Sequence, residues 1–327
     1  MLLSNQTLQG HDASDKLSVM TTTKTTDIKP DHISVCICTF KRPEMLTHTL
    51  EGVIYQITDS AFTFEIVIVD NDKMRSAEEL VHKYQKRGQC KIIYDCEPEQ
   101  GIPLARNRTI RNASGDFIAT IDDDEFPAEN WLHKMYLCLK EFNADGVLGP
   151  VLPHFPAGAP EWLKKSGLCD RPRNITGSPI KYKDSRTGNV LFQRYVFEKD
   201  DKWFDPAMRL TGGSDGEFLS RQINKGRKFV WCDEAIVFET VSEERCSASF
   251  YLKRQFRIGT IAGDRLRSTQ SKNAIIKAGT LFLVYSALFP FSLFARKQTW
   301  IKVLIKLLYN AGCLLSYFSF SDIKHRI

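Results

Sequence analysis

The feature that most restricts the fold of this 327-residue chain is a regular alternation of apolar runs with helix-forming segments. The apolar runs are HISVCICTF (32–40), FEIVIVDND (64–72), CKIIYDCE (90–97) and DFIATIDDDEF (116–126). Continuous apolar strands separated by helices are typical of a parallel sheet that is buried on both faces. We therefore expect an α/β fold in which helices flank a mostly parallel sheet.

The segments between these runs carry helix signals. The first, residues 43–56, has Pro43 at a favoured first helical position. SAEELVHKYQKRG (76–88) combines a serine cap, early acids, late bases and a terminal glycine. GIPLARNRTIRNASG (101–115) begins at a proline and ends at a glycine. These signals predict one helix between each strand and the next.

The composition is that of a globular protein with reduced thiols. Apolar residues make up 43% of the chain and charged residues 26%, which allows a substantial core. The nine cysteines form no CxxC pair, and their odd number argues against a complete set of internal disulfides. Zinc-type spacing is also missing. This pattern favours a cytosolic environment.

The first thirty residues are polar and rich in Ser and Thr. They contain no apolar stretch long enough for a signal peptide. We therefore expect residues 1–31 to form a disordered leader and the folded part of the chain to stay in the cytoplasm.

Positive charge is concentrated in the last part of the chain. Residues 251–327 contain 13 Lys and Arg against Asp264 and Asp322, a balance of 13 − 2 = +11. The whole chain carries +6, so the first 250 residues sum to 6 − 11 = −5. The basic character therefore belongs to the tail.

The same tail is strongly apolar. Residues 278–295 form eighteen positions without a charge, near the minimum of about 17 for a membrane span. Pro290 would kink a helix there. In the following segment, apolar residues recur at helical spacing, interrupted by Lys302 and Lys306. Apolar faces flanked by bases suit helices in the headgroup region of an anionic membrane.

We therefore expect residues 251–327 to be a helical membrane-associating region, peripheral or re-entrant. Two core helices of a soluble domain are the alternative, and whether 278–295 spans the membrane stays open. No nucleic-acid partner is expected, because the bases are interleaved with aliphatic residues and not with a base-stacking platform.

Acidic residues follow two of the predicted strands. Asp70 and Asp72 end one, and IDDDEF places Asp122 to Glu125 at the end of another. In parallel sheets the ligand crevice lies beyond the carboxyl ends of the strands. Because acids this dense repel one another, the sequence predicts a positive partner at that edge.

A divalent cation meets this need. Mg²⁺ and Mn²⁺ bind through one or two carboxylates and complete their shells with water and substrate phosphates. Asp122 and Asp124, two apart on an extended segment, should project to the same side. A calcium loop is excluded, because its sixth and twelfth positions, counted from Asp122, hold Pro127 and His133. A solvated acidic turn is the remaining alternative.

Five motifs in order carry a resemblance to a known family. They are CICTFKRP, IVIVDND, GIPLARNR, IATIDDDEFP and GGSDGEFLSRQ, spread over about residues 33–245. Together they resemble the family 2 glycosyltransferases, inverting enzymes with the GT-A fold, and among them bacterial transferases of the succinoglycan type. These build exopolysaccharide or surface-saccharide units on a lipid carrier. The resemblance implies a nucleotide-sugar-binding half at 32–126 and an acceptor-binding half at 127–250.

The resemblance also implies roles for individual residues on the donor side. Thr39 and Asp70 match positions that contact the nucleotide base and ribose. Arg106 matches a residue near the nucleotide. Asp122 matches the nucleotide-side acid of the D-x-D motif, and Asp124 matches the ligand of Mn²⁺ or Mg²⁺, with Asp122 beside it.

An inverting transfer needs a base on the acceptor side, and Asp215 is the candidate. It follows Gly212 and Gly213 and opens a helical pattern. A helix N-cap is its alternative role, and Glu217 is the nearest competing acid. Ser214 stands where relatives often have a second acid.

Glu239 is a further candidate metal ligand. Relatives often carry a histidine near this position, and the oxygens of Glu239 could replace it. The resemblance gives no firmer role to this residue.

We therefore expect an inverting glycosyltransferase at the cytoplasmic face of the inner membrane, with a UDP-sugar donor and a saccharide acceptor on a lipid carrier. A nucleotidyltransferase is less favoured, because TFKRPEM lacks the glycine of a phosphate loop. A non-catalytic nucleotide-sugar-binding protein is the other alternative, and it could dispense with Asp215.

Overall fold

The structure is a computed structural model that describes residues 30–319, except 182–183, 185, 200–201 and 211. The predicted leader lies outside the described residues apart from its last two positions. Asp31, which was assigned to the leader, is the first residue of strand β1. None of the nine cysteines forms a disulfide in the described part of the chain.

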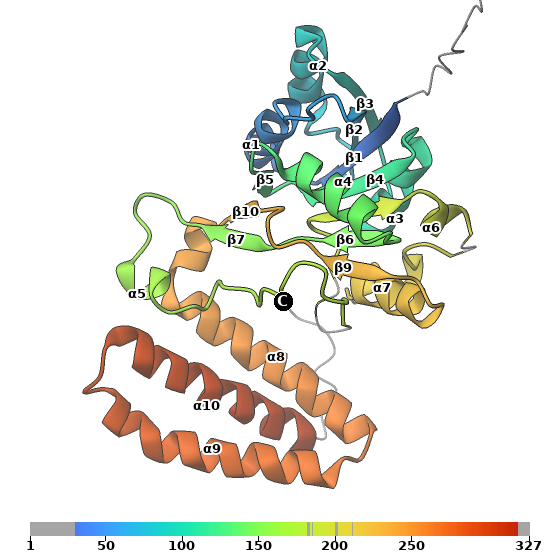
Figure 1. The fold of residues 1–327 in the computed structure, drawn as a ribbon. Coiled ribbons are helices and arrows are strands. Elements are labelled where there is room, and N and C mark those ends of the chain that lie inside the picture. Colours follow the sequence, from blue (N-terminus) through green and yellow to red (C-terminus); the bar gives the residue numbers. More distant parts are fainter. Residues whose placement is uncertain (1–29, 182–183, 185, 200–201, 211, 320–327) are drawn as a thin grey trace, which may run out of the picture. The chain divides into compact units, whose positions relative to one another are not determined.

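Within the described residues, seven strands form the main sheet in the order β3-β2-β1-β4-β8-β6-β9 (Figure 1). Their bounds are β1 Asp31–Thr39, β2 Phe62–Asp70, β3 Lys91–Cys96, β4 Phe117–Asp122, β6 Gly146–Leu148, β8 Val190–Gln193 and β9 Phe229–Trp231. Strands β1 to β4 are mutually parallel, and β8 is antiparallel to both β4 and β6. The mostly parallel sheet predicted from the sequence is confirmed.

Helices cover both faces of this sheet, as continuous apolar strands require. One face packs on α1 (Pro43–Ile54), α2 (Glu78–Arg87) and α4 (Trp131–Glu141). The other packs on α3 (Ile102–Asn112), α6 (Tyr195–Glu198) and α7 (Ser214–Asn224). Neighbouring strand residues alternate between the two cores: Val35 and Ile37 point to the first, and Cys36 to the second.

A second sheet begins where β4 ends. In the described residues it has the order β5-β10-β7, with β5 Glu125–Pro127, β7 Val151–His154 and β10 Val237–Thr240. The prediction of one strand through residue 126 was wrong, because Asp123 and Asp124 form a turn. The Thr49 hydroxyl donates to the carbonyls of Asp123 (3.0 Å) and Glu125 (2.6 Å), which holds the chain in this bend.

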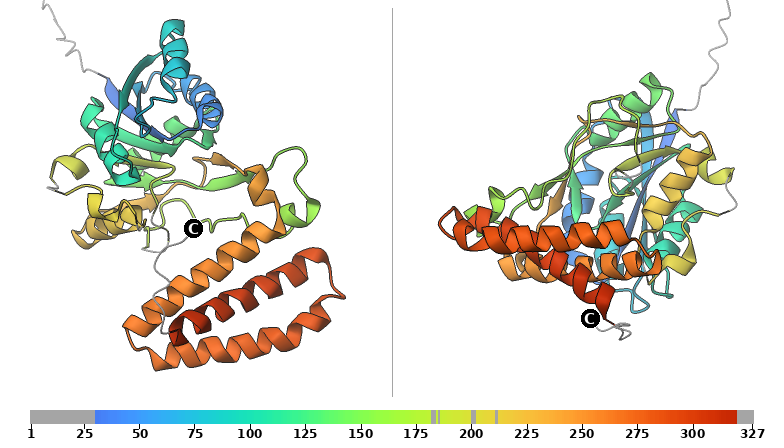
Figure 2. Two further views of the ribbon diagram at one scale, coloured as in Figure 1. Left: turned by 180° about the vertical axis from the view of Figure 1, so that it is seen from behind. Right: turned by 90° about the horizontal axis from the view of Figure 1, so that it is seen from below.

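The described part of the tail is helical, as predicted, with α8 (Ala248–Ser268), α9 (Lys272–Ser292) and α10 (Lys297–Phe318) lying side by side (Figures 1 and 2). Helix α10 packs on both others. Gly259 and Gly263 of α8 lie against the backbone of α10, and Gly312 of α10 lies against the backbone of α8. A Cβ at any of these positions would meet a backbone oxygen, so glycine sets the close approach of the two helices.

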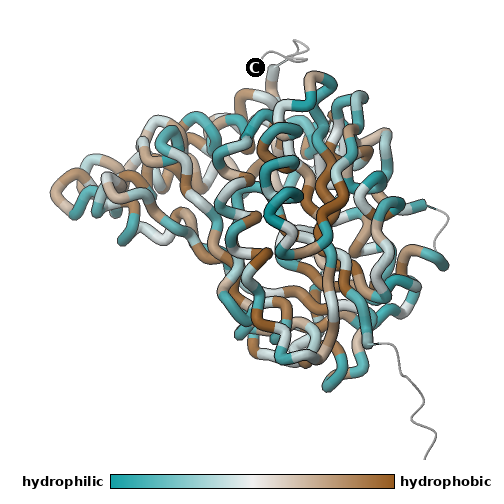
Figure 3. Tube along the Cα trace, turned by 90° about the horizontal axis from the view of Figure 1, so that it is seen from above, coloured by the Kyte–Doolittle hydropathy of each residue, from teal (hydrophilic) through white to brown (hydrophobic). Residues whose placement is uncertain are grey.

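Helices α9 and α10 are long and apolar enough to cross a membrane by length and composition, with mean hydropathies of 1.6 and 1.3. Only 11% of the apolar window of α9 is buried. Phe291 and Phe294, near its C-terminal end, are 75% and 93% exposed. Hydrophobic residues, brown in Figure 3, occur both in the sheet and in the tail.

The short helix α5 (Glu161–Lys164) packs against the tail through Leu163, which lies in one hydrophobic cluster with residues of α8 and α10.

Candidate functional site

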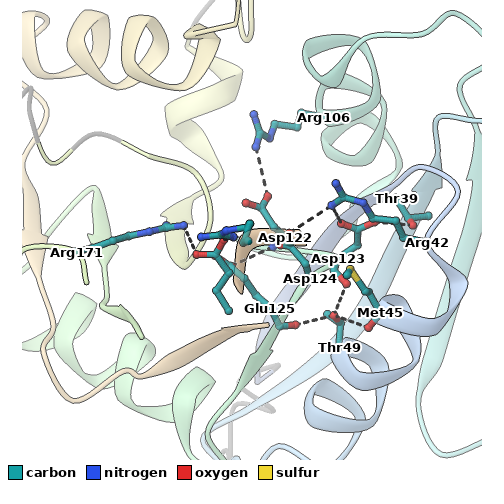
Figure 4. Close-up of polar contacts among 12 residues, drawn as sticks. Thr39, Arg42, Met45, Thr49, Arg106, Asp122, Asp123, Asp124, Glu125 and Arg171 are labelled. Atoms are coloured by element: carbon teal, nitrogen blue, oxygen red, sulfur yellow. Dashed lines mark hydrogen bonds and ion pairs between the residues drawn. The ribbon is translucent and has the colours of Figure 1, made fainter. Parts of the chain in front are cut away.

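The acidic residues 122–125 lie at the carboxyl ends of β1 and β4, where the main sheet gives way to the second sheet (Figure 4). Asp122 is the last residue of β4 and lies in register with Cys38 of β1, one residue before Thr39. The amide of Thr240 in β10 donates to the carbonyl of Asp124 at 2.9 Å. Both sheets therefore position the acidic turn.

Asp123 is buried and held from the β1 side. The Thr39 hydroxyl donates to its Oδ2 at 2.9 Å. Arg42, just after β1, reaches Asp123 Oδ1 at 3.4 Å and Asp124 Oδ2 at 3.3 Å. Burial raises the pKa of Asp123. Thr39, predicted to contact the nucleotide, thus lies at the site and uses its hydroxyl to orient the middle acid.

Asp124 and Glu125 both have raised pKa values. Burial, with the added charges of Asp122, Asp123 and Glu239, raises the pKa of Asp124 to about 6. Burial also raises the pKa of Glu125, which accepts the backbone N–H of Asp122 at 3.2 Å. The carboxylates are therefore poorly neutralised by the protein groups around them.

Arg106 joins the acidic turn to the candidate base. Its Nη2 lies 3.4 Å from Asp122 Oδ1, and its Nη1 is paired with Asp215 Oδ1. Its side chain is only 11% exposed. Burial alone would lower the pKa of Arg106, but the charges of Asp215 and Asp122 outweigh it and raise the pKa. Three predicted site residues are thus brought together by one guanidinium.

Helix α3 carries Arg106, and the next residue of the helix, Asn107, fixes this arrangement. The side-chain amide of Asn107 donates to the carbonyl of Phe204 at 2.8 Å and accepts its N–H at 3.1 Å. The Phe204 ring lies 4.7 Å, centroid to centroid, from that of Phe218 in α7. Because α3 holds the segment that packs against α7, it also sets the position of Asp215.

Asp215 lies in the first turn of α7 and is not its N-cap. The N-cap is Gly213, whose φ of 86° falls in the left-handed region that favours glycine. The side chain of Asp215 is 28% exposed. Glu217, the competing acid, instead pairs with Arg221 Nε at 2.8 Å.

A pocket of about 510 Å³ opens beside Asp215 and Arg106. Its other walls include Ile102, Pro103, Met208 and Arg209. This volume falls in the range of about 300 to 1,000 Å³ that is common for small-molecule sites. The candidate base therefore faces a space that can admit part of a substrate.

Glu239 of β10 lies in register with Glu125, but its carboxylate is already engaged. Arg245 Nη1 contacts Oε1 at 2.5 Å, and Arg171 Nη2 contacts Oε2 at 2.5 Å. The ligand role expected for Glu239 stays a prediction, and in this structure the carboxylate serves as a counter-ion.

Asp70 is not part of the acidic turn. It is fully buried at the end of β2, and it accepts the backbone N–H groups of Asp72 (2.9 Å) and Ala77 (2.8 Å) and the hydroxyl of Tyr94 (3.2 Å). These bonds fix the loop after β2. Its predicted contact with the nucleotide stays a prediction.

Sequence reasoning missed Arg42, Arg171 and Gly188. A Cβ at Gly188 would lie 2.8 Å from Glu125 Oε1 and 3.0 Å from Asp122 Oδ2, so glycine leaves room for the acids. Arg42 could have been found as a base directly after a strand. Arg171 and Gly188 lie in a region without periodic pattern, which gave no signal.

The donor set fits a hard divalent cation held partly by the protein. No group of three or more His, Cys, Asp or Glu side chains in the described ranges converges as a complete metal site. A Mg²⁺ or Mn²⁺ ion needs only one or two carboxylates when substrate phosphates complete its shell. Asp122, whose side chain is 46% exposed, and Asp124, whose pKa is raised by burial and by the neighbouring acids, meet that requirement.

Comparison with known proteins gives the family. The model of glycosyl transferase family 2 matches residues 34–201. The succinoglycan biosynthesis protein ExoM of Rhizobium meliloti (strain 1021) is 31% identical over 236 residues, which are 71% of this chain and 74% of that protein. Chondroitin synthase of Pasteurella multocida (strain Pm70) is 26% identical over 66% of this chain, but the match spans only 26% of that enzyme.

Solved structures show the same fold. The crystal structure of S. aureus TarS 1-349 in complex with UDP superposes with a TM-score of 0.52 at 15% identity, over 87% of this chain and 90% of that one. The predicted GT-A fold is thus confirmed. Together with the family match, this shows that the chain belongs to glycosyl transferase family 2 and is a glycosyltransferase.

Proposed function

We propose that this enzyme transfers a sugar, with inversion, from a UDP-sugar to a hydroxyl of a saccharide acceptor in bacterial surface or exopolysaccharide biosynthesis. The observation that carries the proposal is the Arg106 bridge between Asp122 and Asp215. This bridge brings Asp122, the proposed metal-side acid, and Asp215, the proposed proton acceptor, to one guanidinium beside a pocket.

The donor would bind to the half formed by residues 32–126, with Thr39 and Asp70 near its base and ribose and Arg106 near its phosphates. Asp124 and Asp122 would hold Mn²⁺ or Mg²⁺, and Glu239 is the further candidate ligand. Bound there, the cation would neutralise charge on the departing diphosphate. The UDP in the complex of TarS, a protein of the same fold, supports a UDP-linked donor.

Asp215 would act as the general base in the acceptor half, residues 127–250. Its carboxylate takes the proton of the acceptor hydroxyl while that oxygen attacks the anomeric carbon from the side opposite the leaving group. Arg106 holds the carboxylate toward the pocket before the acceptor arrives. Such positioned base catalysis typically contributes about 10² to 10⁴-fold.

The acceptor would be linked to a lipid carrier at the cytoplasmic face of the inner membrane. The name of ExoM supports a polysaccharide product, and the exposed apolar side of α9 in a basic tail supports a peripheral or re-entrant membrane contact. A soluble catalytic part would thereby meet a membrane-bound substrate.

The test is release of UDP from a panel of UDP-sugars by the full chain with Mn²⁺ and an extract of lipid-linked saccharides. We expect Asp215→Asn to lower turnover by at least 10²-fold while UDP binding persists, and Glu217→Gln to leave turnover within about twofold. Equal turnover by Asp215→Asn would refute the assigned base. Binding without turnover in the wild type would favour a non-catalytic binder, and release of pyrophosphate from a nucleoside triphosphate would favour a nucleotidyltransferase.

A further inference from the structure

Three charged residues, Glu239, Arg171 and Arg245, form a group at the edge of the site, and the two arginines have no role in the mechanism above. Glu239 accepts from Arg171 at one carboxylate oxygen and from Arg245 at the other, both at 2.5 Å. The side chains of Glu239, Arg245 and Arg171 are 12%, 21% and 35% exposed, so the group is partly buried and still reaches the surface. Its formal charge is 2 − 1 = +1.

This group lies beside the metal-binding acids. Glu239 is the partner of Glu125 in the β10–β5 ladder, and the next residue, Thr240, binds the backbone of Asp124. Figure 4 shows Arg171 approaching the acidic turn from the side opposite Arg42. Arg171 also interacts electrostatically with Glu125 of that turn, so a ligand bound on this side of the turn would lie near its guanidinium.

A third arginine lies beside this group, together with the acids Asp184 and Glu125. Arg186 lies near enough to interact with Arg171, Glu125 and Glu239. Burial, followed by repulsion from Arg171, lowers the pKa of Arg186 to about 10, which still leaves it charged at neutral pH. Arginines gathered on one carboxylate, partly out of water, are stabilised by a further anion.

We propose that Arg171 and Arg245 form a diphosphate clamp, and that Glu239 orients their guanidinium groups instead of binding the metal. The inference rests on the proposed function, which supplies the diphosphate. Arginine suits this task because its planar fork matches phosphate oxygens. Of the two arginines, Arg171 is the more exposed, at 35% against 21% for Arg245, so it would be the first to contact a diphosphate bound on this side of the acidic turn.

The clamp would act on the leaving group. When the acceptor oxygen forms its bond to the anomeric carbon, the bond from that carbon to the phosphate oxygen breaks, and its electron pair stays on the diphosphate. The acceptor proton passes to Asp215. Guanidinium donors placed at the oxygens where negative charge develops lower the barrier to this step.

A diphosphate could come from the nucleotide donor or from the linkage between the acceptor and its lipid carrier. Calorimetry on the full chain with Mn²⁺ distinguishes the two, using UDP and UMP as donor probes and geranyl diphosphate, added to UDP-saturated protein, as the acceptor probe. Arg171→Gln is the test variant. Arg173→Gln is its matched control, because Arg173 lies two residues away and pairs with Asp233 outside the acidic turn.

We expect Arg171→Gln to weaken UDP binding by about tenfold or more, and UMP binding by less than twofold, because a charge-assisted hydrogen bond to the second phosphate is lost. Arg173→Gln should match the wild type. A loss confined to geranyl diphosphate would assign the clamp to the acceptor. Unchanged affinity for both diphosphates would overturn the proposal.

Glu239→Gln separates a counter-ion from a metal ligand. We expect it to weaken UDP binding while Mn²⁺ binding without nucleotide, followed by electron paramagnetic resonance, stays within about twofold. Loss of Mn²⁺ binding would show that Glu239 is a ligand and would contradict its proposed role. Arg171→Lys, which keeps the charge, guards against a folding defect in the glutamine variant. If the wild type binds no nucleoside diphosphate, the proposed function itself fails, and the clamp with it.

Discussion

Replacement of Arg106 by glutamine is the perturbation with the most informative outcome. The variant removes a buried cation that lies 3.4 Å from Asp122 and is paired with Asp215. Two unit charges about 4 Å apart interact by about 4 kcal/mol at an effective dielectric constant of about 20. Solvent around Asp122 (46% exposed) and Asp215 (28% exposed), and the desolvation of Arg106, reduce that value. We expect the free energy of unfolding of Arg106→Gln to be lower than that of the wild type by about 1 to 2 kcal/mol.

The two functional readouts should move in opposite directions. Without Arg106, Asp122 loses a competing cation, so the affinity for Mn²⁺ in the absence of nucleotide should rise about threefold to tenfold. Asp215 loses the partner that holds it toward the pocket, so kcat should fall about 10²-fold. A variant that merely folds badly would lose both properties together.

The assays are Mn²⁺ titration followed by electron paramagnetic resonance, turnover of the active UDP-sugar, and urea denaturation. Arg111→Gln is the matched control, because Arg111 is an exposed residue of the same helix that stacks near Trp203. It should leave Mn²⁺ affinity and kcat within about twofold. Parallel losses in Arg106→Gln, or no change in kcat, would refute the bridging role.

Four further predictions concern the ionisation of Asp124, the spacing of the acids and the tail. Because the pKa of Asp124 is raised to about 6, protons should weaken Mn²⁺ binding about tenfold between pH 7 and pH 5, and Asp124→Asn should remove most of this pH dependence. The free energy of unfolding of the metal-free protein should fall as the pH rises from about 4 to 6, because Asp124 must ionise in that window. Urea titrations of the wild type and of Asp124→Asn test this, and a difference between their free energies of unfolding that does not change with pH would contradict it. Gly188→Ala should displace Asp122 and Glu125 and lower turnover about 10²-fold. Gly158→Ala, whose Cβ meets nothing within 4 Å, should have no effect on turnover. Equal turnover by the two variants would show that a Cβ at Gly188 does not crowd the acids. The double variant Phe291→Asp, Phe294→Asp should no longer sediment with anionic vesicles, because it places charges on the exposed apolar end of α9. The control is Ile175→Asp, which changes an exposed apolar residue outside the tail, and its release from the vesicles as well would exclude a specific role for α9.

The sequence predicted strands β1 to β4 of the main sheet and the acidic edge because local patterns determine both. Strands β1 to β4 are continuous apolar runs, and parallel pairing brings their carboxyl ends together, so Asp122 lies in register with Cys38 of β1 and the acidic turn lies next to Thr39. The helix that carries Arg106 was predicted from its proline and glycine boundaries.

Other features depend on contacts that are distant in the sequence. Strand β8 has four residues and pairs with both β4 and β6. No periodic pattern in the sequence predicts this strand or its pairing. The turn at Asp123 is stabilised by Thr49, 74 positions away. Arg171 becomes part of the site only through Glu239, 68 positions on. Such pairings are fixed by tertiary packing, not by local propensity.

Calorimetric titration of UDP into the full chain with Mn²⁺, repeated with EDTA and with Asp124→Ala, tests whether the acidic turn holds the metal and the diphosphate. We expect UDP binding that is weakened at least tenfold by either change, with GDP and dTDP binding more weakly under the same conditions. UDP binding of equal strength in EDTA and in Asp124→Ala would contradict the assignment of the acidic turn as the metal–diphosphate site.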